Sequence, residues 1–509
     1  MINSKGESDY EIFKMITMLL LASMMSAAVI SCGGTDPAAD TPDAGTQADT
    51  AAETTVNTEE LDPLAARMLV DDGLEDTDFG GRTFRILGDD ACEDYYTIEA
   101  ETGDVMDDAV YERNSIVQER FNVIIEANVF DEGKLVSTLK NSVMAGDDEY
   151  QLFAGHIIYA GNSVGQGIYY NWYDMPHIDF SKPWWSDSTV EDLTYDGKAF
   201  IAMGDFALTT IDSTYCIYYN KQIAAEYDLP DMYELVNSGK WTIDTLSEYT
   251  KQVYRDLNGD GKEDDQDLYG FVMWPRSPVN VFLWSFGEKL GKKQDDGKIE
   301  MDYFNDKVIE IYQKLIDFCW NTEGTFMDLQ SSSGTNTQNI AFDMFLNNQV
   351  LFQPNTFNVA ATALRDFETD YGIIPYPKWD EAQEGYYTMV DGGHEGLAVP
   401  LSVGDTDFSG TIIEALSAES YKHTVPTFYD IVLKAKGSRD EQSVAMLDII
   451  FDGRVFDFGY VFGEFGAAFW PQYLVEQKSA DIASYYEKKH LPYDKRIEKA
   501  IKFFEEYES

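Results

Sequence analysis

Short apolar runs and longer stretches of helical spacing alternate along the chain from about residue 80. The runs RTFRILG (82–88), NVIIEANVF (122–130) and YQLFAGH (150–156) have the length and the aromatic or β-branched content of strands. Between them, VMDDAVYERNSIVQERF (105–121) and GKLVSTLKNSVMAG (133–146) carry apolar residues at helical spacing. Alternation of strand, helix and strand favours parallel strands joined by crossover helices. We therefore expect an α/β lobe here.

A second set of elements begins with STYCIYYNKQIAAEYDL (213–229), a predicted strand that runs into a helix. In GKWTIDTLSEYTKQVYRD (239–256) the apolar residues recur at helical spacing, and Thr242 or Asp244 is the expected N-cap. Further helices are predicted at 305–319 and 339–347, further strands at 268–274, 350–355 and 370–377, and a mostly helical region from residue 409 to the C-terminus.

Length, composition and charge narrow the class of protein. A chain of 509 residues exceeds one ordinary core, so two or more lobes are expected, and 44% hydrophobic residues are enough to fill them. The formal net charge of −54 argues against a nucleic-acid partner, because phosphate binding depends on clustered Lys and Arg. Cys92, Cys216 and Cys319 show no metal-ligand spacing.

The N-terminal region has the pattern of an export signal. An apolar, uncharged run at residues 15–30 is too short for a comfortable transmembrane helix and is followed by Ser31 and Cys32. Val29–Cys32 resembles a lipobox, which predicts a lipoprotein signal peptide at residues 1–31 and lipidation of Cys32. The alternative is an ordinary cleaved signal with an incidental cysteine.

Residues 32–79 are expected to form an acidic, flexible tether. The stretch 33–62 is rich in Ala, Thr and Asp and has almost no large apolar side chains, so it cannot bury enough surface to offset its ordering entropy. The expected location is therefore extracytoplasmic, with the folded part lipid-anchored to the outer face of the cell membrane.

The acidic stretch DLNGDGKEDDQD (256–267) has the oxygen-rich spacing of a calcium loop. Gly261 allows the sharp bend, and Lys262 would contribute its backbone carbonyl. The strand predicted after the loop excludes a sensor EF-hand pair, so the choice is between a structural Ca²⁺ clip and an Asx-rich turn. The predicted metal ligands are Asp256, Asn258, Asp260, Lys262, Asp264 and Asp267.

The ordered series of motifs resembles the extracellular solute-binding proteins of family 1, the sugar-binding receptors of ABC importers. The motifs are YYNKQIAAEYDL (218–229), GKWTIDTLSEYTK (239–251), DLNGDGKEDDQDLYGF (256–271), YGIIPYPKW (371–379) and GGHEGLAVP (392–400). Residues 414–450 are similar to a segment of many lipid-anchored, Clostridia-type members. The resemblance runs from about Arg82 to the end of the chain.

This resemblance implies a two-lobed periplasmic-binding-protein-like fold of type II, with the ligand cleft between the lobes. Lobe 1 would comprise residues 80–210 plus about 395–425, and lobe 2 residues 211–394 plus about 426–509. Strands would cross between the lobes near 209–218 and return near 386–400. The implied partners are a carbohydrate and an ABC transporter permease, and the implied state is a monomer without catalytic activity.

Composition and strand ends suggest ligand-binding residues. Sugars need flat aromatic rings and planar polar groups, and the chain has 9 Trp, 32 Tyr and 30 Phe, although most aromatic residues pack in cores. Open α/β sheets bind ligands at strand ends and inter-lobe connections. The predicted ligand-binding residues are Asp89, Asp90, His156, Asp212, Trp274, Phe357, Asp391, His394 and Glu395. His394 could equally be a structural histidine.

Two other functions are weighed against an oligosaccharide receptor. A surface glycoside hydrolase would need two carboxylates a few ångströms apart, and in so acidic a chain such pairs arise by chance. The sequence contains no GxSxG, HExxH, P-loop or GxGxxG motif. A lipid-anchored adhesin or carbohydrate sensor remains open, because delivery depends on a permease.

Overall fold

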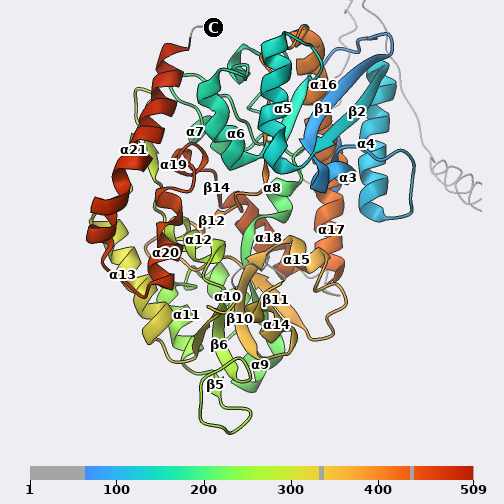
Figure 1. The fold of residues 1–509 in the computed structure, drawn as a ribbon. Helices are drawn as coiled ribbons and strands as arrows, with labels where there is room; N and C mark the ends of the chain where they lie inside the picture. Colours follow the sequence, from blue (N-terminus) through green and yellow to red (C-terminus); the bar gives the residue numbers. More distant parts are fainter. Residues whose placement is uncertain (1–62, 332–337, 436–440, 508–509) are drawn as a thin grey trace, which may run out of the picture. The chain divides into compact units, whose positions relative to one another are not determined.

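The computed structural model describes residues 63–331, 338–435 and 441–507. The predicted signal peptide, Cys32 and most of the predicted tether lie outside the described residues. Residues 61–509 form one compact unit, in which two separate sheets define two lobes (Figure 1). No helix within the described ranges is long and apolar enough to cross a bilayer.

The sheet of lobe 1 has the strand order β13-β3-β1-β2. Strands β1 (Arg82–Asp89), β2 (Val123–Phe130) and β3 (Leu152–His156) are parallel, which confirms the predicted strands and their pairing. Strand β13 (Glu395–Ala398) joins antiparallel to β3 from far along the chain. Helix α4 (Val105–Phe121) packs against β2, and α5 (Glu132–Ala145) packs against β1 and β3.

Helix α4 shows how local sequence sets the ends of these elements. The Asp104 side chain accepts a hydrogen bond from Met106 N at 2.9 Å and caps the N-terminus. Asn122 ends the helix in the left-handed conformation with φ of 48°, which Asn tolerates better than most residues. Val110, Val117 and Phe121 are buried, so the predicted apolar positions face the core.

The sheet of lobe 2 is mixed, with the order β11-β4-β10-β6-β5 and β9 beside β6. Its strands are β4 (Tyr215–Asn220), β5 (Tyr254–Arg255), β6 (Leu268–Met273), β9 (Thr325–Met327), β10 (Val350–Thr356) and β11 (Tyr371–Ile374). The helices are α9 (Lys221–Glu226), α10 (Met232–Asn237), α11 (Ile243–Thr250), α12 (Ser277–Ser285), α13 (Asp306–Asn321), α14 (Ile340–Leu346) and α15 (Asn358–Ala361). The predicted N-cap Thr242 is confirmed, because its side chain accepts from Thr245 N.

The two lobes are joined where three segments of the chain meet. The first crossing begins with the short helix α8 (Thr209–Asp212) rather than with a strand. Thr214 bridges to Val390 on the return segment. There β12 (Thr388–Met389) pairs in parallel with β14 (Arg454–Val455), which brings in a third segment.

The helices after β13 contact elements of both lobes. They are α16 (Thr406–Glu419), a π-helical turn at Ser420–Thr424, α17 (Val425–Ala435), α18 (Glu441–Asp452), α19 (Phe458–Val461), α20 (Trp470–Glu476) and α21 (Ile482–Glu506). Helix α16 packs on α4 of lobe 1, and α20 packs on α12 and α13 of lobe 2. Helix α19 contacts α6 (Ile157–Ser163), an element of lobe 1.

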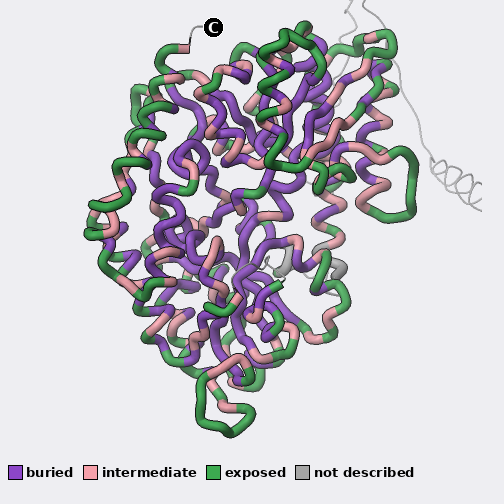
Figure 2. Tube along the Cα trace, in the orientation of Figure 1, coloured by how far each residue is buried: buried purple, intermediate pink, exposed green. Residues whose placement is uncertain are grey.

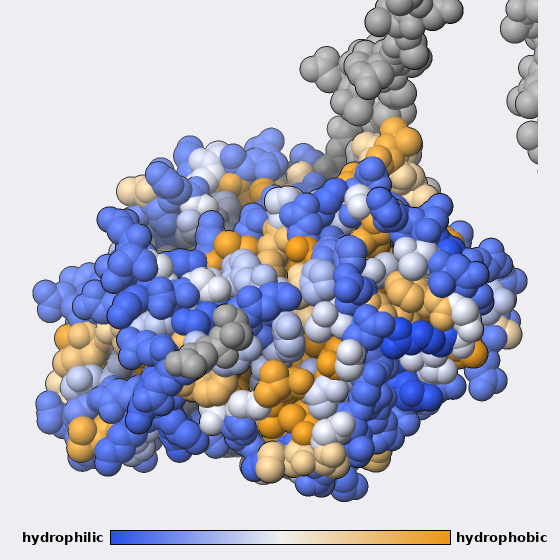
Figure 3. Space-filling model, turned by 90° about the horizontal axis from the view of Figure 1, so that it is seen from above, coloured by the Kyte–Doolittle hydropathy of each residue, from blue (hydrophilic) through white to orange (hydrophobic). Residues whose placement is uncertain are grey.

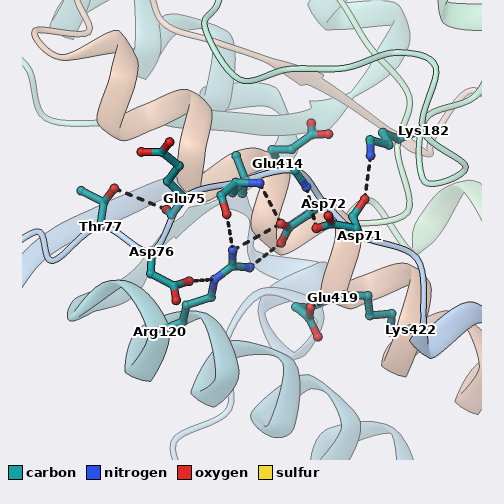
Figure 4. Close-up of polar contacts among 12 residues, drawn as sticks. Asp71, Asp72, Glu75, Asp76, Thr77, Arg120, Lys182, Glu414, Glu419 and Lys422 are labelled. Carbon is teal, nitrogen blue, oxygen red and sulfur yellow. Dashed lines mark hydrogen bonds and ion pairs between the residues drawn. The ribbon is translucent and has the colours of Figure 1, made fainter. Parts of the chain in front are cut away.

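Residues 63–79 pack on lobe 1, which corrects the expected end of the tether at residue 79. The Arg120 guanidinium donates to Asp72, to Asp76 Oδ1 at 2.8 Å and to the Leu74 carbonyl at 2.7 Å (Figure 4). Lys182 Nζ donates to the Asp71 carbonyl at 2.6 Å. Val70, Leu74 and Phe79 also pack against the core of lobe 1. Composition alone missed this segment because it has few apolar residues, and its hold on the lobe depends on charged side chains from distant parts of the chain, Arg120 and Lys182.

Candidate functional site

Three predicted ligand-binding residues meet at one edge of the lobe 1 sheet. Asp89 ends β1 and His156 ends β3, and parallel strands present their carboxyl ends at the same edge. Glu395 begins β13, which runs the other way, and it lies directly opposite His156 in the register of the two strands. The sheet topology therefore brings together residues that lie far apart in the sequence.

Glu395 is a buried carboxyl group with one oxygen left over. Glu395 is only 1% exposed, and its Oε2 atom accepts a hydrogen bond from Thr209 Oγ1 at 3.2 Å. Within the described part of the chain Oε1 has no hydrogen-bond partner. Burial raises the pKa of Glu395 well above its usual range, and the nearby charge of Asp89 raises the pKa further.

Asp212 ends α8, the short helix whose Thr209 donates to Glu395. It accepts hydrogen bonds from Ser213 Oγ at 2.7 Å and from the phenol of Tyr95 at 3.2 Å. Burial raises the pKa of Asp212 to about 7 despite these two donors. Cys92 and Tyr95 complete this group, and burial together with the charges of Asp212 and Glu395 raises the pKa of both.

The return crossing supplies the other half of the site. Asp391 accepts from the phenol of Tyr215 at 2.9 Å and from Gly393 N at 3.0 Å. The Nδ1 atom of His394 donates to the Asp391 carbonyl, and burial lowers the pKa of His394 to about 3, so the ring is neutral. Its Nε2 atom has no partner among the described residues.

His156 lies between the two halves. Its ring stacks on Tyr159 with centroids 4.2 Å apart, and burial lowers its pKa while the charge of Asp391 raises it. Its Nδ1 atom also finds no hydrogen-bond partner in the described ranges. We call the whole set the junction cluster: Asp89, Cys92, Tyr95, His156, Asp212, Asp391, His394 and Glu395.

The remaining predicted ligand-binding residues lie elsewhere or at the rim. Asp90 is exposed next to Asp89. Trp274 is half-buried on lobe 2, where Nε1 donates to the Ser331 carbonyl at 2.7 Å. Phe357 is 0% exposed and stacks on Phe451 with centroids 4.9 Å apart, so its ring packs in the core and does not face a ligand in this conformation.

A cavity of about 510 Å³ lies between the lobes, and the residues that line it were not predicted from the sequence. It is lined by short stretches of four distant segments: α7 (Asp187–Glu191), the region from Trp284 to Lys292, Tyr387, and Asp452–Val455. No motif or local periodicity connects such residues, so the sequence carried no signal for it. Cys92 and Tyr95 were also missed, although both follow the first strand closely.

The predicted calcium loop is an exposed loop between β5 and β6 (Figure 2). Asp256 Oδ2 accepts from Gly261 N at 2.9 Å, and the loop glycine Gly261 has φ of 72°, which the tight bend requires. Asp260 forms an ion pair with Lys262 at 2.8 Å, and the buried Asp267 accepts from Leu257 N at 3.1 Å. In the described ranges no group of three or more His, Cys, Asp or Glu side chains is placed to hold a metal ion. The Ca²⁺ site stays a prediction.

The arrangement of two sheets, crossing segments and shared C-terminal helices is the two-lobed α/β fold of periplasmic binding proteins, as the comparisons with solved structures show. UspC from M. tuberculosis superposes with a TM-score of 0.55 at 12% identity, covering 81% of this chain and 99% of that one. A cyclo/maltodextrin-binding protein in complex with maltotetraose gives a TM-score of 0.50 at 14% identity, covering 83% and 96%. No family model and no curated protein matches the chain.

Proposed function

We propose that the protein is an extracytoplasmic, lipid-anchored substrate-binding protein that captures a carbohydrate and delivers it to an ABC transporter. The observation that carries the proposal is the junction cluster, where polar groups of both lobes converge and three buried atoms have no hydrogen-bond partner in the part of the chain that the structure describes. Buried polar atoms are normally satisfied, so atoms left over at an inter-lobe site favour a polar ligand. The fold shared with a maltotetraose-bound protein supports a carbohydrate.

The mechanism is capture without chemistry. The ligand binds to groups of one lobe, and the other lobe closes over it. The permease recognises the closed form. The crossing segments are the places where such a movement can occur, because they connect the two sheets and also pair with each other. Binding free energy sets how far ligand shifts the population towards the closed form.

Thermal unfolding of residues 32–509 carrying Cys32→Ser tests the ligand class. The panel contains oligosaccharides, monosaccharides, polyols and peptides, with maltotetraose as the first oligosaccharide. A ligand at about 100 times its Kd should add about 2.7 kcal/mol to the free energy of unfolding. A stabilising sugar that is recovered unchanged supports a receptor. A sugar that is consumed identifies an enzyme, and stabilisation by peptides alone overturns the carbohydrate proposal.

The lipid anchor has its own experiment. In cells fed a labelled fatty acid, the full chain should become labelled and fractionate with membranes, and Cys32→Ser should abolish both. Cys92→Ser is the matched control, since Cys92 lies in the folded part of the chain. Label that persists in Cys32→Ser contradicts anchoring at this residue.

Delivery separates a transport receptor from a sensor or adhesin. Deleting the gene for the protein should stop uptake of the bound sugar, and wild-type protein should restore it. Normal uptake in the deletion strain, combined with sugar binding by the purified protein, favours the sensor or adhesin.

A further inference from the structure

Most charged groups around the junction cluster are carboxyls, and Arg454, whose charge acts on His394, is a cation on the β14 side. The charges that raise the pKa of Glu395 and Asp212 are the carboxylates of Asp89 and Asp391. The charges of Asp90 and Asp131 raise the pKa of Asp89. The charges of Asp212 and Glu395 raise the pKa of Cys92 and of Tyr95. A group of carboxyls packed against one another in low dielectric attracts a cation strongly.

Two of the three leftover polar atoms of the cluster can accept a hydrogen bond. Glu395 Oε1 is an acceptor when the carboxyl group is ionised, and it belongs to a residue 1% exposed. His394 Nε2 is an acceptor because Nδ1 carries the proton that goes to the Asp391 carbonyl, and His394 is also 1% exposed. Neither atom has a hydrogen-bond partner among the described residues, and with Glu395 ionised both can accept from a ligand donor.

Each carboxyl group already binds donors of its own, which limits what the cation can be. Asp212 accepts from Tyr95 and Ser213, and Asp391 accepts from Tyr215 and Gly393. Glu395 keeps one oxygen available and commits the other to Thr209. The acceptor atoms left over on the neighbouring residues His394 and Glu395 suit an ammonium group, which has three separate N–H donors and one positive charge. Asp89, His156 and Asp391 are partly exposed, so a ligand can reach the cluster from solvent.

We infer that the carbohydrate captured at this junction carries a primary amine, so that an amine-bearing oligosaccharide binds in preference to its acetylated or neutral counterparts. This inference rests on the proposed function and names the chemical class of its ligand. The ammonium group is held by Glu395, and the acidic surroundings supply the preference for charge.

Binding of an amine-bearing sugar should release protons from the protein, whereas binding of a neutral sugar should not. Burial favours the protonated forms of Glu395 and Asp212, and a bound ammonium group favours the ionised forms. Binding of the amine therefore releases protons into the buffer near neutral pH. His394 is already neutral and His156 has a lowered pKa, so the two histidines do not supply these protons.

The test uses residues 32–509 carrying Cys32→Ser and three tetrasaccharides: tetra-glucosamine, its fully N-acetylated form, and maltotetraose. Titration calorimetry in two buffers of different ionisation enthalpy measures affinity and proton release together. We expect tetra-glucosamine to bind about tenfold or more tightly than the N-acetylated form, and to release protons. EDTA in the cell removes any contribution from a metal ion.

Glu395→Gln keeps the shape of the side chain and removes the charge. It should abolish the preference for the amine and reduce proton release, whereas Glu126→Gln, on an exposed carboxylate of the same sheet, should change neither. If Glu395→Gln does not fold, Asp212→Asn and the proton release of the parent decide the question. Equal affinity for the amine and its acetylated form overturns the inference and leaves the carbohydrate proposal standing, whereas binding of none of the sugars in the panel overturns both.

Discussion

The phenol of Tyr215 donates a hydrogen bond of 2.9 Å to Oδ2 of Asp391, and it thereby joins the first crossing segment to the returning one. The same segments share further bonds: Asp391 N donates to the Ser213 carbonyl at 2.9 Å, and Thr388 Oγ1 donates to the Tyr215 carbonyl at 2.8 Å. The crossing segments are therefore connected by side chains as well as by backbone, and bending between the lobes moves them as a pair.

Removing the phenol of Tyr215 tests this connection. Tyr215→Phe should lower the free energy of unfolding by about 1–2 kcal/mol, because a hydrogen bond to a charged group is lost from a fully buried side chain. Urea unfolding measures the change. Tyr473→Phe, at a half-buried tyrosine of α20, should have an effect within about 0.5 kcal/mol. Equal changes in the free energy of unfolding in the two variants would show that the hydrogen bond between Tyr215 and Asp391 does not stabilise the crossing segments.

The charged contacts of residues 71–78 should hold the N-terminal segment on lobe 1. Arg120→Ala removes the donors to Asp76 and the Leu74 carbonyl and leaves the Asp72 side chain, only 3% exposed, without its cation. We expect a loss of about 2 kcal/mol in stability and faster proteolysis between residues 63 and 79. Arg255→Ala breaks an exposed pair with Glu226 and should cost less than about 1 kcal/mol.

Calcium should stabilise lobe 2 through the loop at 256–267. We expect a higher Tm with Ca²⁺ than with chelator, and no such difference in Asp260→Ala, because a ligand bound only to the folded state adds stability by mass action. Asp295→Ala, on another exposed acidic turn, should keep the full response. An unchanged Tm of the parent on adding chelator identifies the loop as an Asx-rich turn.

The face of the protein in Figure 3 is mostly hydrophilic, with smaller hydrophobic areas between polar ones. An acidic, well-solvated surface of this kind follows from the composition of the chain. Exposed large apolar side chains include Leu64, Met68 and Leu69 on and just after α2 (Pro63–Met68). Hydropathy patterns locate cores well, but such single exposed residues carry no local signal.

Several strands and helices with strong periodicity were predictable to within a residue or two, whereas the helix predicted up to residue 256 ends at Thr250, before β5. The predicted helix at 105–121 coincides with α4, and the predicted strand at 82–88 is β1 less its last residue. The region from 157 to 212 was left without elements, because its helices are short and its contacts are with distant segments. Local periodicity cannot report contacts that depend on the folded chain.

The same difference between local sequence pattern and contacts of the folded chain applies to the candidate site. The positions of Asp89 and His156 could be predicted because each ends a strand, and that of Glu395 because it follows a glycine-rich return segment, whereas their role in binding stays a prediction. Phe357 was misplaced because an aromatic ring after a strand looks the same in sequence whether it faces a cleft or stacks on Phe451 in the core. The carboxyl group of Asp212 accepts hydrogen bonds from Tyr95 and Ser213, and only the fold brings Tyr95 to it.

Asp212 should make the protein more stable at mildly acidic than at neutral pH. Burial raises its pKa from 3.8 to about 7 in the folded state, so between about pH 4 and pH 7 the folded form binds a proton that the unfolded form does not. This contribution is fully present below the unfolded pKa and is lost as pH rises through the folded pKa. Asp212 alone then contributes on the order of 2 kcal/mol between pH 5 and pH 7.

The variant Asp212→Asn should flatten the pH dependence of unfolding, measured in urea across this range. Asp405→Asn is the matched control with the opposite sign: the hydrogen bond from Arg82 lowers the pKa of Asp405, so its contribution is present above the unfolded pKa and is lost as pH falls through the folded one. This variant should therefore be destabilised about equally from pH 5 to pH 8 and keep the slope of the parent. An unchanged slope in Asp212→Asn would show that Asp212 is ionised in the folded protein at neutral pH, and the junction would then hold its negative charge without releasing protons to a ligand.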